Sequence, residues 1–180
     1  MLELIRKDYY YREKGKLISM ETTGKKPAEL ISNEIAPAFG RKLLEFGSCG
    51  TSIAEQIIDQ CDYLALTDKD PEIKAKLEPL TKNDKIQLIP DSELSEDCYF
   101  GRFHLVYTIF GFRGLPHLVD EIMRLRRLIL KGGKIAVIDH ASDDFEAECI
   151  KQLKRCGFTN FTSETFVHSG AEAFLLTAQK

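Results

Sequence analysis

The sequence predicts a Rossmann-like α/β domain, in which a parallel sheet carries helices on both faces. Two observations predict this fold. Short apolar runs alternate with helical patterns of about ten residues over most of the chain, as in successive strand–helix–strand units. The first apolar run, Lys42–Phe46, leads into a glycine-containing loop, Glu45–Ser52, and then into a helical pattern. A strand, a glycine loop and a helix in this order are typical of folds that bind nucleosides.

Two helices are expected before the first strand. Residues 1–14 have apolar side chains on one helical face, and a second helix begins at Pro27, a residue favoured in a first turn. We therefore expect residues 1–40 to form a helical segment that packs on the site or caps it. Residues 41–180 are expected to form the cofactor-binding part of one structural domain.

The remaining elements follow from the same patterns. The predicted helices are Thr51–Gln60, one that begins at Asp70-Pro71, Pro116–Leu130, and residues 143–155. The predicted strands are Lys42–Phe46, Tyr63–Thr67, Lys85–Ile89, Phe103–Phe110, Lys134–Asp139, and two segments near Asn160–Thr165 and Ala173–Ala178. Gly132-Gly133 is expected to end the helix Pro116–Leu130. Because such sheets bind ligands beyond the carboxyl ends of their strands, the residues that follow strands are the candidates for function.

The composition excludes several classes of protein. The 180 residues carry a formal net charge of -3, so the overall charge does not attract nucleic acid or an anionic membrane. No apolar run approaches the roughly 18 residues of a membrane span, and the first residues do not resemble a signal peptide. The five cysteines include no CxxC pair and the four histidines no closely spaced pair, so no metal site is expected. These features predict a cytoplasmic protein with reduced thiols.

The loop Glu45–Ser52 is the strongest candidate for a cofactor site. Gly47 and Gly50 allow a tight turn and a close approach of the backbone to a ligand. The loop leads to a helix N-terminus, where free N–H groups favour negative charge. The alternative is that the two glycines serve only the turn.

Acidic residues follow the next two predicted strands. Asp68 lies about 20 positions after Gly47, the spacing at which an acid can accept both hydroxyls of a ribose. Asp70, directly before Pro71, fits the cap of the following helix better, which leaves Asp68 for the ribose. Asp91 follows the third strand and could accept from the exocyclic amine of a purine, or it could serve only as a turn residue.

Taken in order, these motifs resemble those of class I S-adenosylmethionine-dependent methyltransferases. KLLEFGSCGTS is similar to the family's glycine-rich first motif, ALTDKDPE to its second and IQLIPDSEL to its third. FHLVYTIFGF occupies the place of the fourth-strand motif, which lines the methionine side of the cofactor. LRRLILKGGKIAVIDH is similar to the family's helix, Gly-Gly turn and fifth strand, and AFLLTAQK to its closing hairpin. The resemblance implies a three-layer αβα sandwich with a mostly parallel seven-stranded sheet and an antiparallel C-terminal hairpin strand.

The resemblance also implies that the cofactor is S-adenosylmethionine. Glu45 stands where the first motif has its acid, Asp68 would bind the ribose, and Asp91 would lie near the adenine. The predicted cofactor-binding residues are Glu45, Gly47, Ser48, Cys49, Gly50, Asp68, Lys69, Asp91, Ser92 and Tyr107. The glycine loop departs from the family's pattern, because Gly47 and Gly50 are three positions apart. Either the loop is one residue longer than in the family, or it has lost its middle glycine.

Methyl transfer is an in-line displacement in which the protein supplies mainly orientation, so no fixed catalytic residue is required. Tyr107 and His140 are the candidates for catalysis, and the titratable ring of His140 could act as a base. Phe112 and Arg113 are the candidates for binding the substrate. Each position has a plain alternative, such as a partly exposed loop histidine for His140 and a solvated loop residue for Arg113.

Two further groups of side chains are candidates for contacts outside the cofactor loop. Tyr10 and Tyr11 belong to a run of three tyrosines and could wall the substrate pocket, since the segment before the first strand often folds over the site in this family. Packing onto the domain is the alternative. The basic residues Arg124, Arg126, Arg127 and Lys131 are expected to form a solvated helix face, with a partner surface as the alternative.

These observations leave three hypotheses for function. The first is methyl transfer from S-adenosylmethionine to an unidentified acceptor, either a small molecule or a macromolecule. The second is a catalytically inactive methyltransferase-like partner or scaffold subunit, which the altered glycine loop motivates. A nicotinamide-dependent enzyme is the third, and the glycine pattern fits it less well. The short segment at residues 111–115 predicts an open pocket that a larger substrate, a second copy in a homo-oligomer or a partner subunit would complete.

Overall fold

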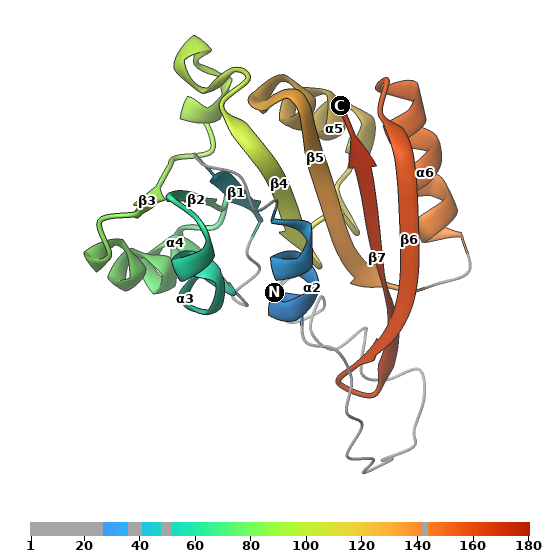
Figure 1. Cartoon of the computed structure of the whole chain (residues 1–180), viewed down its shortest axis with the longest axis horizontal. Coiled ribbons are helices and arrows are strands. Elements are labelled where there is room, and N and C mark those ends of the chain that lie inside the picture. The colour runs from blue at the N-terminus through green and yellow to red at the C-terminus, as the bar shows by residue number, and fades with distance from the viewer. Residues whose placement is uncertain (1–26, 36–40, 48–51, 142–143) are drawn as a thin grey trace.

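The computed structural model describes residues 27–35, 41–47, 52–141 and 144–180. Seven strands form one sheet in the order β3-β2-β1-β4-β5-β7-β6, and helices lie on both of its faces (Figure 1). The strands are β1 (Lys42–Phe46), β2 (Tyr63–Thr67), β3 (Ile86–Leu88), β4 (Phe103–Ile109), β5 (Ile129–His140), β6 (Thr159–His168) and β7 (Ala171–Gln179). The helices are α2 (Pro27–Glu34), α3 (Ala54–Ile57), α4 (Pro71–Leu77), α5 (Leu118–Leu128) and α6 (Phe145–Arg155), with 3-10 turns at Ile58–Gln60, Glu78–Lys82, Glu93–Ser95 and Asp97–Tyr99.

The pairing of the strands confirms the predicted fold class. β1 pairs in parallel with β2 and β4, β2 pairs in parallel with β3, and β4 pairs in parallel with β5. β7 runs antiparallel between β5 and β6. The sheet is therefore mostly parallel, and the C-terminal hairpin supplies its antiparallel part. From β1 the chain builds outward to β2 and β3 on one side and then to β4 and β5 on the other, which creates a topological switch point beside β1.

Alternate side chains of the central strands point into two hydrophobic cores. Leu44, Phe46 and Val106 belong to the core that α5 and α6 cover. Leu43 and Leu105 belong to the core that α2, α3 and α4 cover. Because both faces of these strands are buried, the strands are nearly uninterrupted apolar runs in the sequence. Burial of each such leucine contributes roughly 2 kcal/mol to folding by removing apolar surface from water.

Several predicted boundaries differ by one or two residues, and the boundary between α5 and β5 differs by more. The helix expected to end at Gly132-Gly133 ends at Leu128, and β5 begins at Ile129. Ile129 has the spacing of the apolar stripe of the helix, but its backbone is extended, its side chain is fully buried, and it pairs with Phe103 of β4. After this pair the register of β5 against β4 shifts, and Gly132-Gly133 lies in that irregular part of the strand. Pairing with β4 and burial therefore outweigh the local helical pattern.

The segment after β1 also differs from the prediction, because the helix expected over Thr51–Gln60 is shorter. Regular helix spans Ala54–Ile57 and continues as a 3-10 turn to Gln60. Ser52 Oγ accepts from the Ala54 N–H at 3.2 Å, which satisfies one of the free donors at this helix start. None of the described helices is long and apolar enough to span a membrane.

The N-terminal prediction is confirmed only where the structure describes the chain. α2 begins at Pro27 as predicted, and Leu30 and Ile31 are fully buried in the core on its side of the sheet. The helix predicted over residues 1–14 lies outside the described residues, as do Tyr10 and Tyr11. The division into residues 1–40 and residues 41–180 stays a prediction, and so does the capping role of the first segment.

Candidate cofactor site at the carboxyl edge of the sheet

Glu45 is a buried carboxylate at the switch point that two hydroxyl groups anchor. Its side chain is 1% exposed although it is a carboxylate, and it lies directly opposite Tyr107 in the pairing of β1 with β4. The Tyr107 hydroxyl donates to Glu45 Oε2 at 2.7 Å, and the Ser52 hydroxyl donates to the same oxygen at 3.2 Å. Two hydroxyl donors therefore hold this carboxylate beside the predicted cofactor loop, of which residues 48–51 lie outside the described residues.

Tyr107 is positioned to hold Glu45. Burial raises the pKa of the Tyr107 phenol well above its usual value, and the adjacent Glu45 carboxylate raises it further. At neutral pH the phenol is therefore protonated and acts as a hydrogen-bond donor. The geometry suits a positioning role, and direct participation of Tyr107 in catalysis stays a prediction.

The loop after β2 brings a second acid to the same edge. Asp70 caps α4 by accepting from the Glu72 N–H at 2.8 Å, which confirms the predicted cap. Asp68 is 9% exposed and accepts from the Asp70 N–H at 2.9 Å. The Gly47 N–H donates to the Thr67 carbonyl at 2.9 Å, so the start of the glycine loop lies against the end of β2. Glu45, near the end of β1, and Asp68, directly after β2, thus lie on neighbouring parallel strands at the edge where Gly47 has a φ of +66°.

The loop after β4 packs against the same glycine. Gly111 lies so close to β1 that an added Cβ would be 2.9 Å from the Gly47 carbonyl oxygen and 3.3 Å from that of Phe46. Phe110, just before it, has a φ of 55°, a conformation that costs energy for a bulky side chain. The backbones of the two loops therefore meet directly at the switch point.

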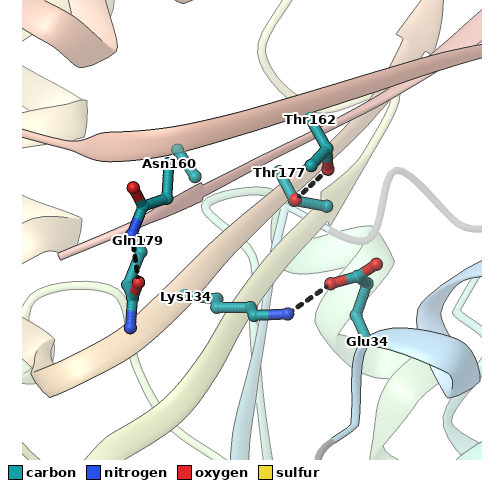
Figure 2. A pocket seen from close by; sticks show the side chains of 7 residues that line it. Glu34, Lys134, Asn160, Thr162, Thr177 and Gln179 are labelled. Carbon is teal, nitrogen blue, oxygen red and sulfur yellow. Dashed lines mark hydrogen bonds and ion pairs between the residues drawn. The ribbon is translucent and has the colours of Figure 1, made fainter.

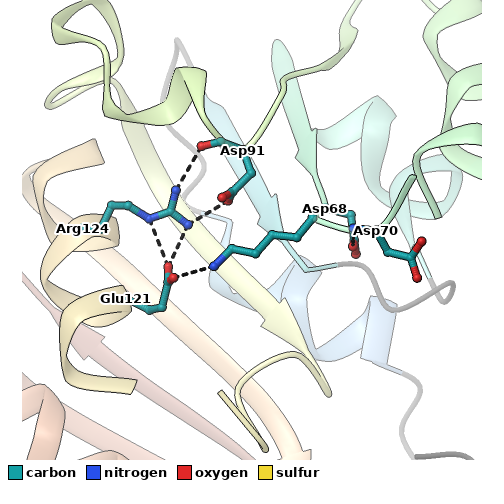
Figure 3. A network of polar contacts seen from close by, with 6 residues as sticks. Asp68, Asp70, Asp91, Glu121 and Arg124 are labelled. Carbon is teal, nitrogen blue, oxygen red and sulfur yellow. Dashed lines mark hydrogen bonds and ion pairs between the residues drawn. The ribbon is translucent and has the colours of Figure 1, made fainter. Parts of the chain in front are cut away.

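Asp91 lies in a chain of ion pairs that reaches across to α5 (Figure 3). Arg124 Nη2 donates to Asp91 Oδ1 at 2.7 Å, and Arg124 also pairs with Glu121 at 2.7 Å. Lys69 completes the chain through Glu121 at 2.6 Å. Ser92, next to Asp91, is exposed at the start of the 3-10 turn Glu93–Ser95.

The basic residues of α5 are therefore not a uniform solvated face. The prediction is wrong for Arg124, whose side chain is 20% exposed and ion-paired. The Arg126 guanidinium lies over the Phe158 ring at 6.0 Å, and that of Arg127 lies over the Phe100 ring at 4.2 Å. Stacking on aromatic rings lets these cations cover apolar surface.

At the end of β5, Asp139 organises the loop that follows β4. Asp139 is 1% exposed and accepts from the Arg113 N–H at 3.2 Å and from the His140 N–H at 2.8 Å. The Arg113 side chain lies 3.7 Å from Asp139, donates to the His140 carbonyl at 3.0 Å and covers the Phe145 ring. Phe112 is 1% exposed and packs edge-on against Phe46 in the core.

His140 lies beside an aromatic cluster at the same edge. Its ring stacks on Phe110 with 4.5 Å between centroids, and His168 from the end of β6 lies 5.5 Å from the same phenylalanine. Burial lowers the pKa of His140, and the nearby Arg113 and His168 lower it further. The His140 ring is therefore neutral at physiological pH and able to accept a proton.

The comparisons with known proteins agree with this architecture. The sequence matches no family model and no curated protein. A methyltransferase from Aquifex aeolicus described as SAM dependent superposes with a TM-score of 0.67 at 16% identity, covering 85% of this chain and 89% of that chain. An S-adenosylmethionine-dependent methyltransferase from Mesorhizobium loti gives a TM-score of 0.66 at 11% identity, with coverages of 84% and 97%. The chain has the class I methyltransferase fold.

The methyltransferase fold alone does not define the reaction. The [4+2]-cyclase SpnF superposes on the chain with a TM-score of 0.71 at 11% identity, covering 85% of this chain and 80% of SpnF. Proteins that are named for different reactions therefore have this architecture. The residues at the carboxyl edge, and not the fold, determine which reaction such a chain performs.

Within the methyltransferase fold, the carboxyl edge brings most of the described candidates together. They are Glu45, Gly47, Asp68, Lys69, Asp91, Tyr107, Arg113 and His140. Sequence reasoning missed Asp139, Glu121 and His168, and it did not assign Arg124 to the site. Asp139 ends a predicted strand, which is the one local signal that could have identified it. Glu121 stands three positions before Arg124, a spacing that allows an ion pair on a helix, but its contact with Lys69 spans 52 positions. His168 carries no local signal, because its aromatic partner Phe110 lies far away along the chain.

A separate hollow of about 240 Å³ lies at the opposite edge of the sheet (Figure 2). Its lining includes the ion pair Lys134–Glu34 at 2.9 Å and a hydrogen bond between Thr162 and Thr177 at 2.6 Å. These polar side chains are paired with one another and lie far from the carboxyl ends of the parallel strands. The hollow is therefore not a candidate for the cofactor site.

Asp139 makes the stability of the fold depend on pH. Burial raises the pKa of its carboxyl to about 6, although backbone N–H groups and Arg113 partly offset this. This pKa is higher than the roughly 3.9 of an aspartate in the unfolded chain, so the folded protein favours the protonated carboxyl of Asp139. The stability that this carboxyl contributes is therefore fully present below about pH 4 and is lost as the pH rises through about 6. The free energy of unfolding of wild type, measured with urea relative to that of Asp139→Asn, should fall by about 2 kcal/mol between about pH 4 and 7.

The comparison of wild type with Asp139→Asn isolates the titration of Asp139, because His140 titrates in both proteins. Asp120→Asn, at an exposed position of α5, serves as the matched control and should show no such trend. A difference between wild type and Asp139→Asn that stays constant over this pH range would contradict the prediction.

Proposed function

We propose that the chain binds S-adenosylmethionine at the carboxyl edge of β1, β2 and β3 and transfers its methyl group to an acceptor that is not yet identified. The observation that carries the proposal is the pair of buried carboxylates, Glu45 and Asp68, at the carboxyl ends of the neighbouring strands β1 and β2. Burial of two acids at one edge is costly unless ligands or donors compensate for it. Glu45 accepts from the Tyr107 hydroxyl and Asp68 accepts from the Asp70 N–H, and Asp68 stands where a ribose would supply two further donors.

Each part of the cofactor has candidate residues at this edge. Asp68 would hold the ribose, Asp91 would accept from the exocyclic amine of the adenine, and Glu45 would lie on the methionine side. Gly47 and the predicted residues Ser48, Cys49 and Gly50 would let the backbone approach the ligand closely. The side chains at the carboxyl edge therefore fit the cofactor in number, type and order along the chain.

The protein's contribution to the reaction would be orientation and proton transfer. The cofactor supplies an electrophilic methyl group on a sulfonium, and the acceptor's lone pair forms the new bond as the sulfur–carbon bond breaks. His140 is neutral and stacked beside Phe110, where it would take the proton from an acceptor that must lose one. Arg113, Tyr10 and Tyr11 stay candidates for contacts with the acceptor, and Arg113 would act through its anchored guanidinium. The predicted contact through Phe112 is not proposed further, because its ring is 1% exposed and packs in the core against Phe46.

Calorimetry with S-adenosylmethionine and S-adenosylhomocysteine tests the proposal directly. Wild type should bind both ligands, and Asp68→Ala should bind them about 100-fold more weakly, because two hydrogen bonds to a charged group are lost. Asp59→Ala is a suitable control, since Asp59 is an exposed acid on the 3-10 turn after α3. Absence of binding in wild type would refute the proposal, and binding of NAD instead would favour a nicotinamide-dependent enzyme.

One observation favours the second candidate, an inactive partner or scaffold subunit. Asp91, the acid expected at the adenine, already accepts from Arg124. If this pair excludes the base, neither S-adenosylmethionine nor S-adenosylhomocysteine will bind, and Asp68→Ala will change nothing. The same titrations therefore separate the two candidates.

A further inference from the structure

Four charged side chains link the loops that follow β2 and β3 to the same helix. Lys69 follows Asp68 directly, Asp91 lies after β3, and Glu121 and Arg124 lie on α5 (Figure 3). The three contacts of the chain measure 2.6 Å for Lys69–Glu121, 2.7 Å for Glu121–Arg124 and 2.7 Å for Arg124–Asp91. Asp91, proposed for the base, is thus one end of the network, and Asp68, proposed for the ribose, is the residue before Lys69 at the other end.

Arg124 holds Asp91 at two points. Its Nη2 donates to Asp91 Oδ1 at 2.7 Å, and its Nη1 donates to the Asp91 carbonyl oxygen at 3.1 Å. Such a two-point contact fixes both the side chain and the backbone of Asp91, which a single contact would not do. Asp91 Oδ2 has no protein partner within the part of the chain that the structure describes.

The guanidinium itself is held from two further directions. Glu121 Oε2 accepts from Arg124 Nε at 3.0 Å and from Nη2 at 2.7 Å, and the Phe46 ring lies 5.4 Å from the guanidinium carbon. Burial raises the pKa of Glu121, but the hydrogen bonds from Lys69 and Arg124 outweigh it and leave the pKa below its usual value. The side chains of Arg124, Glu121 and Asp91 are only 17–20% exposed, so this network is better shielded from water than a surface ion pair.

We propose that Arg124 is a positioning residue that sets which nucleobase the site accepts. This inference rests on the proposed function. With Oδ1 and the carbonyl oxygen of Asp91 engaged, Oδ2 is the oxygen left to meet the base. A carboxylate oxygen accepts hydrogen bonds and donates none, so it favours the exocyclic amine of adenine over the carbonyl of hypoxanthine. Glu121 supports this arrangement by fixing Arg124, and Lys69 extends it to the ribose side.

The test compares S-adenosylhomocysteine with its deaminated counterpart, S-inosylhomocysteine, by calorimetry. Wild type should prefer the adenine ligand by about 30-fold, because the inosine ligand sets a carbonyl against Asp91. Arg124→Gln should reduce this preference to within about threefold, mainly through weaker binding of S-adenosylhomocysteine. Glu121→Gln should change the preference in the same direction but by less.

Arg126→Gln is the matched control, because Arg126 lies on the same helix and stacks on Phe158 without contacting Asp91. Its preference should equal that of wild type. If Arg124→Gln unfolds below the assay temperature, Arg124→Lys, which keeps the charge but not the fork of donors, should still lower the preference.

Each other result has a definite meaning. Equal weakening of both ligands by Arg124→Gln would make Arg124 merely structural and overturn the inference. Tighter binding of S-adenosylhomocysteine by that variant would also overturn it, since Arg124 would then compete with the base for Asp91. If wild type binds and the Arg124 variants keep its preference for S-adenosylhomocysteine, this inference alone is refuted. If wild type binds neither ligand, the proposed function is refuted as well.

Discussion

Replacing Gly111 by alanine is expected to destabilise the fold by about 3 kcal/mol and to abolish ligand binding at the carboxyl edge. The new Cβ would overlap the Thr108 hydroxyl and come within 2.9 Å of the Gly47 carbonyl oxygen. Thr108 is 1% exposed, so neither neighbour can move without shifting β1 or β4. Because the displaced backbone is that of the glycine loop, the loss of stability and the loss of binding have one cause.

Urea denaturation measures the stability change, and calorimetry with S-adenosylhomocysteine measures the binding. Gly101→Ala is the control, since an added Cβ there meets no atom within 4 Å and the cost comes only from its φ of +63°. That cost should be about 1 kcal/mol, without effect on binding. If Gly111→Ala is as stable as Gly101→Ala, Gly111 does not lie in close contact with Gly47.

Tyr107→Phe is the second change with a large expected effect. It removes the hydroxyl that donates to Glu45 at 2.7 Å and leaves a buried carboxylate without that donor. The free energy of unfolding at neutral pH should fall by about 2 kcal/mol, because loss of a partner at a buried charged group costs more than loss at a neutral one. Binding of S-adenosylhomocysteine should weaken about tenfold as Glu45 loses its fixed orientation.

A double-mutant cycle with Glu45→Gln isolates this contact. The neutral amide needs the phenol less, so Tyr107→Phe should cost about 1 kcal/mol less in the Glu45→Gln background. Tyr63→Phe provides the control, because it removes a hydroxyl whose 2.6 Å contact with Gln87 is exposed. A Tyr107→Phe protein no less stable than Tyr63→Phe would rule out a structural role for the Glu45–Tyr107 pair.

The strands of the parallel sheet show how much of the fold local patterns can predict. β1 and β2 have the bounds Lys42–Phe46 and Tyr63–Thr67, as predicted, because strands buried on both faces are mostly apolar. The cap at Asp70 was also predictable, since its contact with Glu72 spans only two positions. The start of β5 was not predictable, because Ile129 fits the apolar stripe of the helix as well as it fits a strand. Its pairing with Phe103 decides that its backbone is extended.

In the candidate site, too, local patterns predicted the positions of residues but not their partners. The positions of Glu45, Gly47 and Asp68 at strand ends followed from the order of the motifs. The partners of these residues did not, since Tyr107 lies 62 positions from Glu45 and Arg124 lies 33 positions from Asp91. Arg124 was predicted to be solvated because its own helix shows a polar face there, and the loop after β3 that covers it leaves no trace in the local pattern.

The sequence by itself determined the order of most strands and helices that the structure describes, and which acids and glycines stand near the ends of β1, β2 and β3. These features depend on side chains within a few residues of one another, so periodicity and spacing are enough to predict them. Only the tertiary structure decided that Tyr107 holds Glu45, that Gly111 touches Gly47, and that Arg124 clamps Asp91. Those contacts exist because the sheet and α5 pack segments that are distant in the chain against one edge, and the strength of such contacts depends on burial that no local pattern encodes.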